Sequence, residues 1–146
     1  RDCSVLAQKN GLKNVVVTNG YFCQEPMVEL LPYIDALNID LKGFTEEFYQ
    51  KLAGSLEPVK RSIVLAAGPC HVEVTTLIIP GENDSREEME RLSEWLASID
   101  KSIPLHISRF FPGYRMTGKN STPVETVYNL ADLARKRLLY VYEGNC

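Results

Sequence analysis

The chain has 146 residues, 45% of them hydrophobic, with 9 Gly, 8 Pro and a formal net charge of -3. This composition is typical of a folded globular domain and excludes a disordered or collagen-like chain; a domain of this length buries roughly 70% of its unfolded surface. The 19 acidic residues outnumber the 16 basic ones, which argues against nucleic-acid binding, because that relies on clustered positive charge.

The helices and strands expected in the first half of the chain alternate. Each is indicated by its apolar spacing and by the Gly, Pro and Asn residues that separate it from the next. They are a helix ending near Lys9, a strand at Val15–Thr18, a helix opened by Pro26, a strand at Ala36–Gly43, a short helix capped by Thr45 and a helix at about Pro58–Ala67.

The second half continues the same alternation. Ser85 with Glu88, and Thr122 with Glu125, have the spacing of a capping box, so each pair predicts the start of a helix. The elements expected here are a strand at Val72–Ile79, a helix after Ser85, a strand at Leu105–Phe110, a helix capped by Thr122 with Pro123 in its first turn, and a strand at Leu138–Tyr142.

Strands that alternate with helices at this spacing predict βαβ units and therefore a parallel sheet. We expect an α/β fold in one domain spanning residues 1–146. The pattern does not decide between an open sheet and a barrel. Five strands are too few to close an eight-stranded barrel, so a barrel requires a partial one or missing chain.

The four cysteines give no local metal-binding spacing, and we expect no metal site in this chain. They are Cys3, Cys23, Cys70 and Cys146. No secretory leader is visible, so a reducing cytoplasm is the expected location. No apolar run approaches the ~20 residues that span a bilayer, so we expect no membrane partner. Since the chain begins without Met and stops directly after a strand-like segment, we expect it to be a piece of a longer protein.

Three of the expected strands carry polar residues at alternate positions, where covered parallel strands are usually apolar. If these faces converge, they line one polar site near the carboxyl ends of the strands, where α/β folds bind ligands. Local pairing on any single strand would be a purely structural explanation, but three strands together favour a site. The residues are Asn38, Asp40 and Lys42, then Glu73 and Thr75, then His106 and Ser108.

For several other residues, the sequence allows either a structural role or a contact with a ligand or partner. Thr18 and Asn19 fit either an ordinary strand-ending turn or a ligand contact. His71 is interpreted as surface structure, whereas His106 either orients a substrate or is a satisfied core histidine. The basic loop around Gly113 is either solvated or contacts an anionic or protein partner. Its basic residues are Arg109, Arg115 and Lys119.

Several motifs with known chemistry are absent. The chain has no glycine-rich phosphate loop of the Walker or Rossmann type and no G-x-S-x-G nucleophile elbow. Kinase, NAD-dependent dehydrogenase and serine hydrolase functions therefore lose support.

Six ordered segments resemble the radical S-adenosylmethionine (radical SAM) enzymes, in the branch of pyruvate formate-lyase activating enzymes. The first three are Val17–Gly20 (VTNG), Leu37–Lys42 (LNIDLK) and Thr75–Asp84 (TTLIIPGEND). The other three are most similar to the subgroup called AmmeMemoRadiSam-system radical enzymes: His106–Pro112 (HISRFFP), Thr122–Thr126 (TPVET) and Tyr140–Asn145 (YVYEGN). Together they extend from the first strand almost to the end of the chain.

The resemblance implies the C-terminal part of a partial (β/α)6 barrel that holds S-adenosylmethionine and a [4Fe-4S] cluster. Reductive cleavage of S-adenosylmethionine would give a 5′-deoxyadenosyl radical that abstracts hydrogen. The implied partners are a glycyl-radical enzyme or a small molecule as substrate, and a reductant such as flavodoxin or ferredoxin. The implied cofactor-binding positions are Thr18, Asn19, Asp40, Lys42 and Thr75. His106, chosen from the polar strand face, completes the predicted cofactor-binding residues.

Two departures from this family stand out. Thr75 falls where the activating enzymes place an arginine near the methionyl carboxylate. The family's C-x-x-x-C-x-x-C cluster motif is missing, so the cluster ligands would lie outside this chain, and the piece alone is expected to be inactive.

Two alternatives belong to other classes of function. A Schiff-base (β/α)-barrel lyase would use Lys42 as its amine nucleophile, with Asp40 beside it. A non-catalytic binding module would need neither side chain. Borohydride trapping distinguishes the lyase, because it alone predicts a covalent adduct on Lys42.

Overall fold

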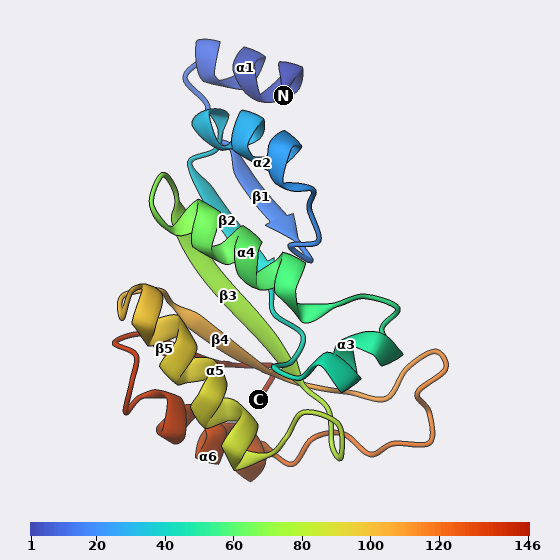
Figure 1. Ribbon diagram of the computed structural model, residues 1–146. Helices are drawn as coiled ribbons and strands as arrows, with labels where there is room; N and C mark the ends of the chain where they lie inside the picture. The colour runs from blue at the N-terminus through green and yellow to red at the C-terminus, as the bar shows by residue number, and fades with distance from the viewer.

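The computed structural model describes all residues, 1–146, and contains one five-stranded parallel sheet (Figure 1). The strands follow one another in chain order across the sheet, so each pairs with the next. This confirms the α/β, parallel-stranded prediction, and the unclosed five-stranded sheet is what part of a partial barrel requires. The strands are β1 (Val15–Thr18), β2 (Ala36–Asp40), β3 (His71–Ile78), β4 (Leu105–Arg109) and β5 (Val141–Gly144).

Helices connect the strands and lie against one face of the sheet. Figure 1 shows α2, α4 and α5 in front of the strands, and α6 packs on β4 and β5. No helix combines the length and apolar character needed to cross a membrane. The helices are α1 (Asp2–Lys9), α2 (Gln24–Leu30), the 3-10 turn η1 (Leu31–Tyr33), α3 (Glu46–Lys51), α4 (Leu56–Ala67), α5 (Arg86–Ile99) and α6 (Val124–Ala134).

The core lies between the sheet and these helices. Successive side chains of a strand point to opposite faces, and the central strands alternate between buried and half-buried residues accordingly. Ile39, Val74 and Ile107 are fully buried on the helix-covered face. On β1, Val15 and Val17 point to the other face and are 64% and 77% exposed. We call this second, uncovered face the open face.

Two expected starts of elements are wrong. Thr122 does not cap α6: its hydroxyl donates to Ile78 O and accepts from Phe110 N, and Pro123 takes the cap position. The last strand begins at Val141 rather than Leu138, because Leu138 is buried in the core after α6. In both cases the residue makes contacts with other parts of the fold, which local spacing does not reveal.

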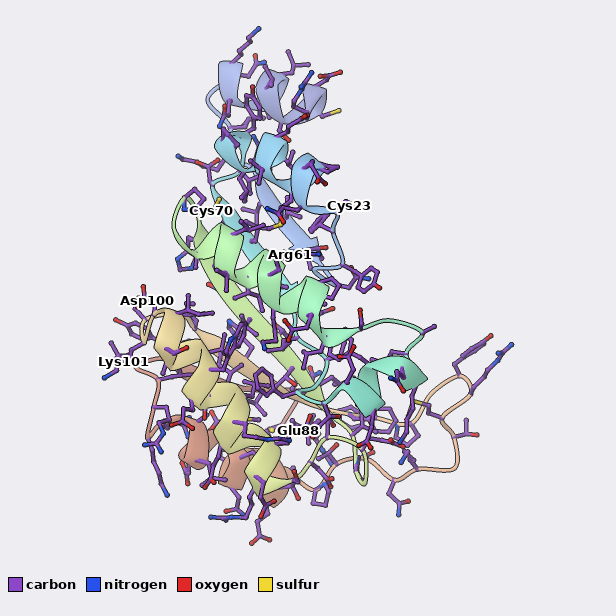
Figure 2. The ribbon with its side chains drawn as sticks, in the orientation of Figure 1. Cys23, Arg61, Cys70, Glu88, Asp100 and Lys101 are labelled. Carbon is purple, nitrogen blue, oxygen red and sulfur yellow. The ribbon has the colours of Figure 1, made fainter.

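The capping box at α5 is only half formed. Ser85 accepts a hydrogen bond from Glu88 N, as predicted. The Glu88 carboxylate does not return to the cap; it is buried and accepts from Phe44 N in the segment after β2. Figure 2 shows Glu88 near the start of α5. The side chain thus joins α5 to the chain beyond the carboxyl end of β2.

Candidate functional site

A row of side chains crosses four neighbouring strands on the open face. The register pairs Asp40 with Thr75, Thr75 with His106, and His106 with Tyr142. Neighbouring strands lie about 4.8 Å apart, so this row runs across the sheet rather than along one strand. The His106 and Tyr142 rings stack with their centroids 5.3 Å apart. The fold therefore brings Asp40, Thr75 and His106 to one surface.

Asp40 and Lys42 form an ion pair where β2 ends. Lys42 Nζ lies 2.6 Å from Asp40 Oδ2, and the side chains are 39% and 30% exposed, respectively. Both therefore stay accessible to a ligand. The backbone of Lys42 is fixed by a hydrogen bond from its N–H to the Tyr49 hydroxyl, and burial raises the pKa of that phenol to about 12. The pair combines a hydrogen-bond acceptor and a cation at the ligand-binding end of a parallel sheet.

Glu73 lies between two imidazoles on the same face. Its carboxylate is 3.1 Å from His71 Nε2 and 2.8 Å from His106 Nε2. The contact with His71 is the largest influence on the pKa of Glu73, which is lowered although partial burial acts the other way. His71 is exposed at the start of β3 as expected, but it belongs to this cluster rather than to an isolated surface position.

Two further polar side chains of the open face pair with each other. Thr75 Oγ1 donates to Asn38 Oδ1 over 3.0 Å.

Ser108 lies opposite Gly144 of β5, and a Cβ on that glycine would come within 2.8 Å of Ser108 Oγ. Because Gly144 has no side chain, the open face has space beside Ser108.

The first strand ends in a turn that closes on itself. Thr18 Oγ1 accepts from Gly20 N, and Asn19 Oδ1 accepts from Tyr21 N. Gly20 has φ +70°, and a Cβ there would lie 2.7 Å from Ile39, so only glycine fits. Thr18 is in register with Ile39, which places it on the helix-covered face and not in the row with Asp40. The observed contacts of both side chains are those of a turn.

A cavity of about 430 Å³ adjoins this turn and the end of β2. Lys42 and Asn19 contribute its polar groups, and most of the remaining lining is aromatic or aliphatic. Other lining residues include Tyr21, Phe48, Tyr49, Leu77 and Ile79. Such a cavity, with few polar groups at one side, suits a ligand that has a flat apolar part and a charged part.

Sequence reasoning missed Asn83 as a structural residue of this region. The side chain is buried and donates to Lys42 O and Leu77 O, while it accepts from Ile79 N. It therefore ties the ends of β2 and β3 together beneath the ion pair. Asn83 lies within the PGEND segment (Pro80–Asp84), which was the available signal.

The chain's residues do not fit an iron–sulfur cluster. Cys3, Cys23 and Cys146 are exposed, Cys70 is half-buried, and Figure 2 shows Cys23 and Cys70 in different connecting segments, before α2 and before β3. No group of three His, Cys, Asp or Glu side chains gathers as metal ligands. A cluster requires three or four thiolates around one centre. Cluster ligands would have to come from outside these residues.

Solved structures that align with this chain include a pyruvate formate-lyase activating enzyme domain, a radical SAM methyltransferase and TYW1. A domain of pyruvate formate-lyase activating enzyme from Bacteroides vulgatus aligns with 99% of this chain and 88% of its own, with a TM-score of 0.83 and 16% identity. A radical SAM methyltransferase from Sphaerobacter thermophilus aligns with 92% of this chain and 41% of its own, with a TM-score of 0.67 and 14% identity.

The chain has the fold of a radical SAM enzyme domain. Archaeal TYW1 has it too, with a TM-score of 0.62 and 17% identity over 94% of this chain and 44% of its own. No family model matches the sequence. The uncharacterized protein MJ0808 of Methanocaldococcus jannaschii is 42% identical over 99% of this chain, which spans only 44% of that relative's length.

Proposed function

We propose that this chain is the C-terminal part of a radical SAM enzyme and that its open face binds S-adenosylmethionine. The observation that carries the proposal is the Asp40–Lys42 ion pair, which lies on the open face at the carboxyl end of β2 in this fold. Ligands of parallel α/β sheets bind at that end. The activating enzyme domain with the same fold supports the same assignment.

The side chains present match the chemistry of S-adenosylmethionine. Asp40 is an acceptor for the ribose hydroxyls, and Lys42 is a donor for the methionyl carboxylate. The adjoining cavity, with Asn19 and Tyr21 in its lining, suits the adenine ring. Thr75 and His106 continue the polar row, whereas Thr18 would act only by shaping the turn.

When bound beside a cluster supplied by the rest of the protein, S-adenosylmethionine provides a radical for hydrogen abstraction. In this proposal the chain's own residues hold and orient that cofactor. The substrate is either a glycyl-radical enzyme, as for the activating enzymes, or a small molecule on the open face. A reductant such as flavodoxin or ferredoxin supplies the electron, and the four unpaired cysteines agree with a reducing cytoplasm.

The Schiff-base alternative would use Lys42 as its amine nucleophile, with Asp40 Oδ2 2.6 Å from its Nζ. Borohydride trapping with a carbonyl substrate distinguishes it, because it alone predicts a covalent adduct on Lys42. The binding-module alternative predicts that both side chains are dispensable for every activity of the natural protein.

The test is electron paramagnetic resonance of the full natural protein, reconstituted without oxygen and reduced. The proposal predicts a cluster signal that changes when S-adenosylmethionine is added. A protein that assembles no cluster, in a longer chain that also lacks the cysteine triplet, would overturn the proposal and bring Lys42 forward as a nucleophile.

A further inference from the structure

The segment that leaves β4 forms a loop with closed ends. Phe110 N donates to Thr122 Oγ1, and Thr122 N donates to Phe110 O over 3.1 Å. Thr122 is fully buried and also donates to Ile78 O at the end of β3. A loop whose ends are fixed together in this way is an Ω-loop, a type that frequently carries function. We call residues 110–122 the β4–α6 loop; it stands clear of the sheet in Figure 1.

A second anchor holds this loop against the turn that follows β3. Lys119 Nζ donates to Pro80 O over 2.9 Å and lies 2.9 Å from Glu82. Glu82 also pairs with Lys51 of α3, so its carboxylate joins three segments. Lys119 is therefore occupied within the chain, while the tip of the loop between the anchors remains free.

Near the tip, arginine guanidinium groups lie over exposed aromatic rings. Tyr114 is 86% exposed and Phe111 is 52% exposed. Arg115 Cζ lies 5.1 Å from the Tyr114 ring centroid, and Arg109 Cζ, at the end of β4, lies 4.7 Å from that of Phe111. Neither arginine forms an ion pair with a carboxylate of this chain. Arg115 thus faces solvent without an ion-pair partner, whereas Arg109 is half-buried and its Nε donates to Thr122 O over 2.6 Å.

The charge of this segment contrasts with the rest of the chain. Residues 109–122 hold three of the 16 basic residues and none of the 19 acidic ones. Tyr, Phe, Met and Arg are the residue types enriched at protein–protein interfaces, and Met116 is also partly exposed here. Stacking on the rings keeps the guanidinium groups oriented, which lowers the entropy lost on binding.

We propose that the β4–α6 loop is a docking surface for an acidic polypeptide segment that presents carboxylates beside apolar side chains. Arg115 would take a carboxylate through paired hydrogen bonds. Arg109, whose Nε is held by Thr122 O, would take one through its terminal NH2 groups. The Tyr114 and Phe111 rings would take the apolar side chains between them. Charge complementarity selects such a partner, because residues 109–122 hold no acidic residue and Arg115 has no ion-pair partner in this chain.

A single-stranded nucleic acid would also stack on aromatic rings beside arginines. It needs a continuous basic track for successive phosphates, however, and the chain outside the loop is acidic overall. The polypeptide is therefore the better match. This inference goes beyond the proposed cofactor site and does not depend on it, because its test measures binding and not turnover.

The experiment measures fluorescence anisotropy of a labelled copolymer of Glu and Tyr added to the full natural protein at low salt. We expect binding that weakens with salt, and weaker binding of a polymer of Glu alone. Arg115→Glu should weaken binding at least about tenfold. Tyr114→Asn should weaken it several-fold, and asparagine tolerates the φ of +48° at this position. Arg137→Glu, the same charge change at an exposed site after α6, is the matched control and should leave binding nearly unchanged.

Three outcomes would overturn the inference. The first is that the copolymer does not bind. The second is that Arg115→Glu and Arg137→Glu weaken binding equally, which would indicate a general charge effect. The third is that a labelled single-stranded oligonucleotide binds more tightly than the copolymer and loses affinity in the same loop variants.

Discussion

Side chains of β2 alternate between two environments. Leu37 and Ile39 are buried beneath the helices, whereas Asn38 and Asp40 are half-buried on the open face. The covered face of the strands is mostly apolar, with fully buried residues such as Ile39, Val74 and Ile107, and depends on close packing. The open face pairs its polar groups with one another and keeps them accessible, as in the Asp40–Lys42 and Thr75–Asn38 contacts. One face therefore accounts for stability, and the other carries the proposed cofactor site.

The largest difference between the faces should appear in stability. Ile39→Ala removes a fully buried side chain from the covered face, so the free energy of unfolding should fall by about 2–5 kcal/mol. Val17→Ala on the open face, where Val17 is 77% exposed, should change it by less than about 0.5 kcal/mol. Urea unfolding of both variants measures this contrast, and equal losses would contradict the division of roles.

A substitution of Asn83 tests how the ends of β2 and β3 are held together. Asn83→Leu leaves Lys42 O, Leu77 O and Ile79 N without their partner, so we expect a loss of at least about 2 kcal/mol despite the added apolar volume. The same urea experiment measures it. A neutral result would mean that water or a shifted backbone replaces the three hydrogen bonds. It would also remove Asn83 as the support of Lys42.

The exposed edge of the open face should have a smaller effect, on association rather than folding. β1 pairs only with β2, and Val15 and Val17 are exposed on it. An edge strand with exposed apolar residues favours self-association. Light scattering should show oligomers of the 146-residue chain, and Val17→Lys should shift them toward monomers. A chain that stays monomeric at high concentration would refute this expectation.

The sequence predicted the strands and the polar face well because both depend on local alternation. Asp40, Thr75 and His106 share a face through the period of two and the parallel register, so their meeting follows from the pattern. The Glu73–His71 contact joins alternate residues of one strand, so it follows from the same alternation, although His71 considered alone fits a surface position.

What the sequence did not predict depends on distant partners. Glu88 bonds to Phe44 rather than to its own cap, and Thr122 bonds to Ile78 rather than to α6. Buried polar groups take whichever partner the fold brings close, and local spacing does not encode that choice. Thr18 differs from these two residues: its register with Ile39 places it on the covered face, away from Asp40.

The most direct test of the central claim is calorimetric titration of S-adenosylmethionine into the reconstituted full natural protein. Asp40→Ala and Lys42→Ala should each weaken binding at least about tenfold, since each removes a charged group proposed to contact the cofactor. Asp132→Ala, an exposed carboxylate on α6, is the matched control and should bind as the parent protein does. Unchanged affinity in both site variants would contradict the claim that the open face holds the cofactor.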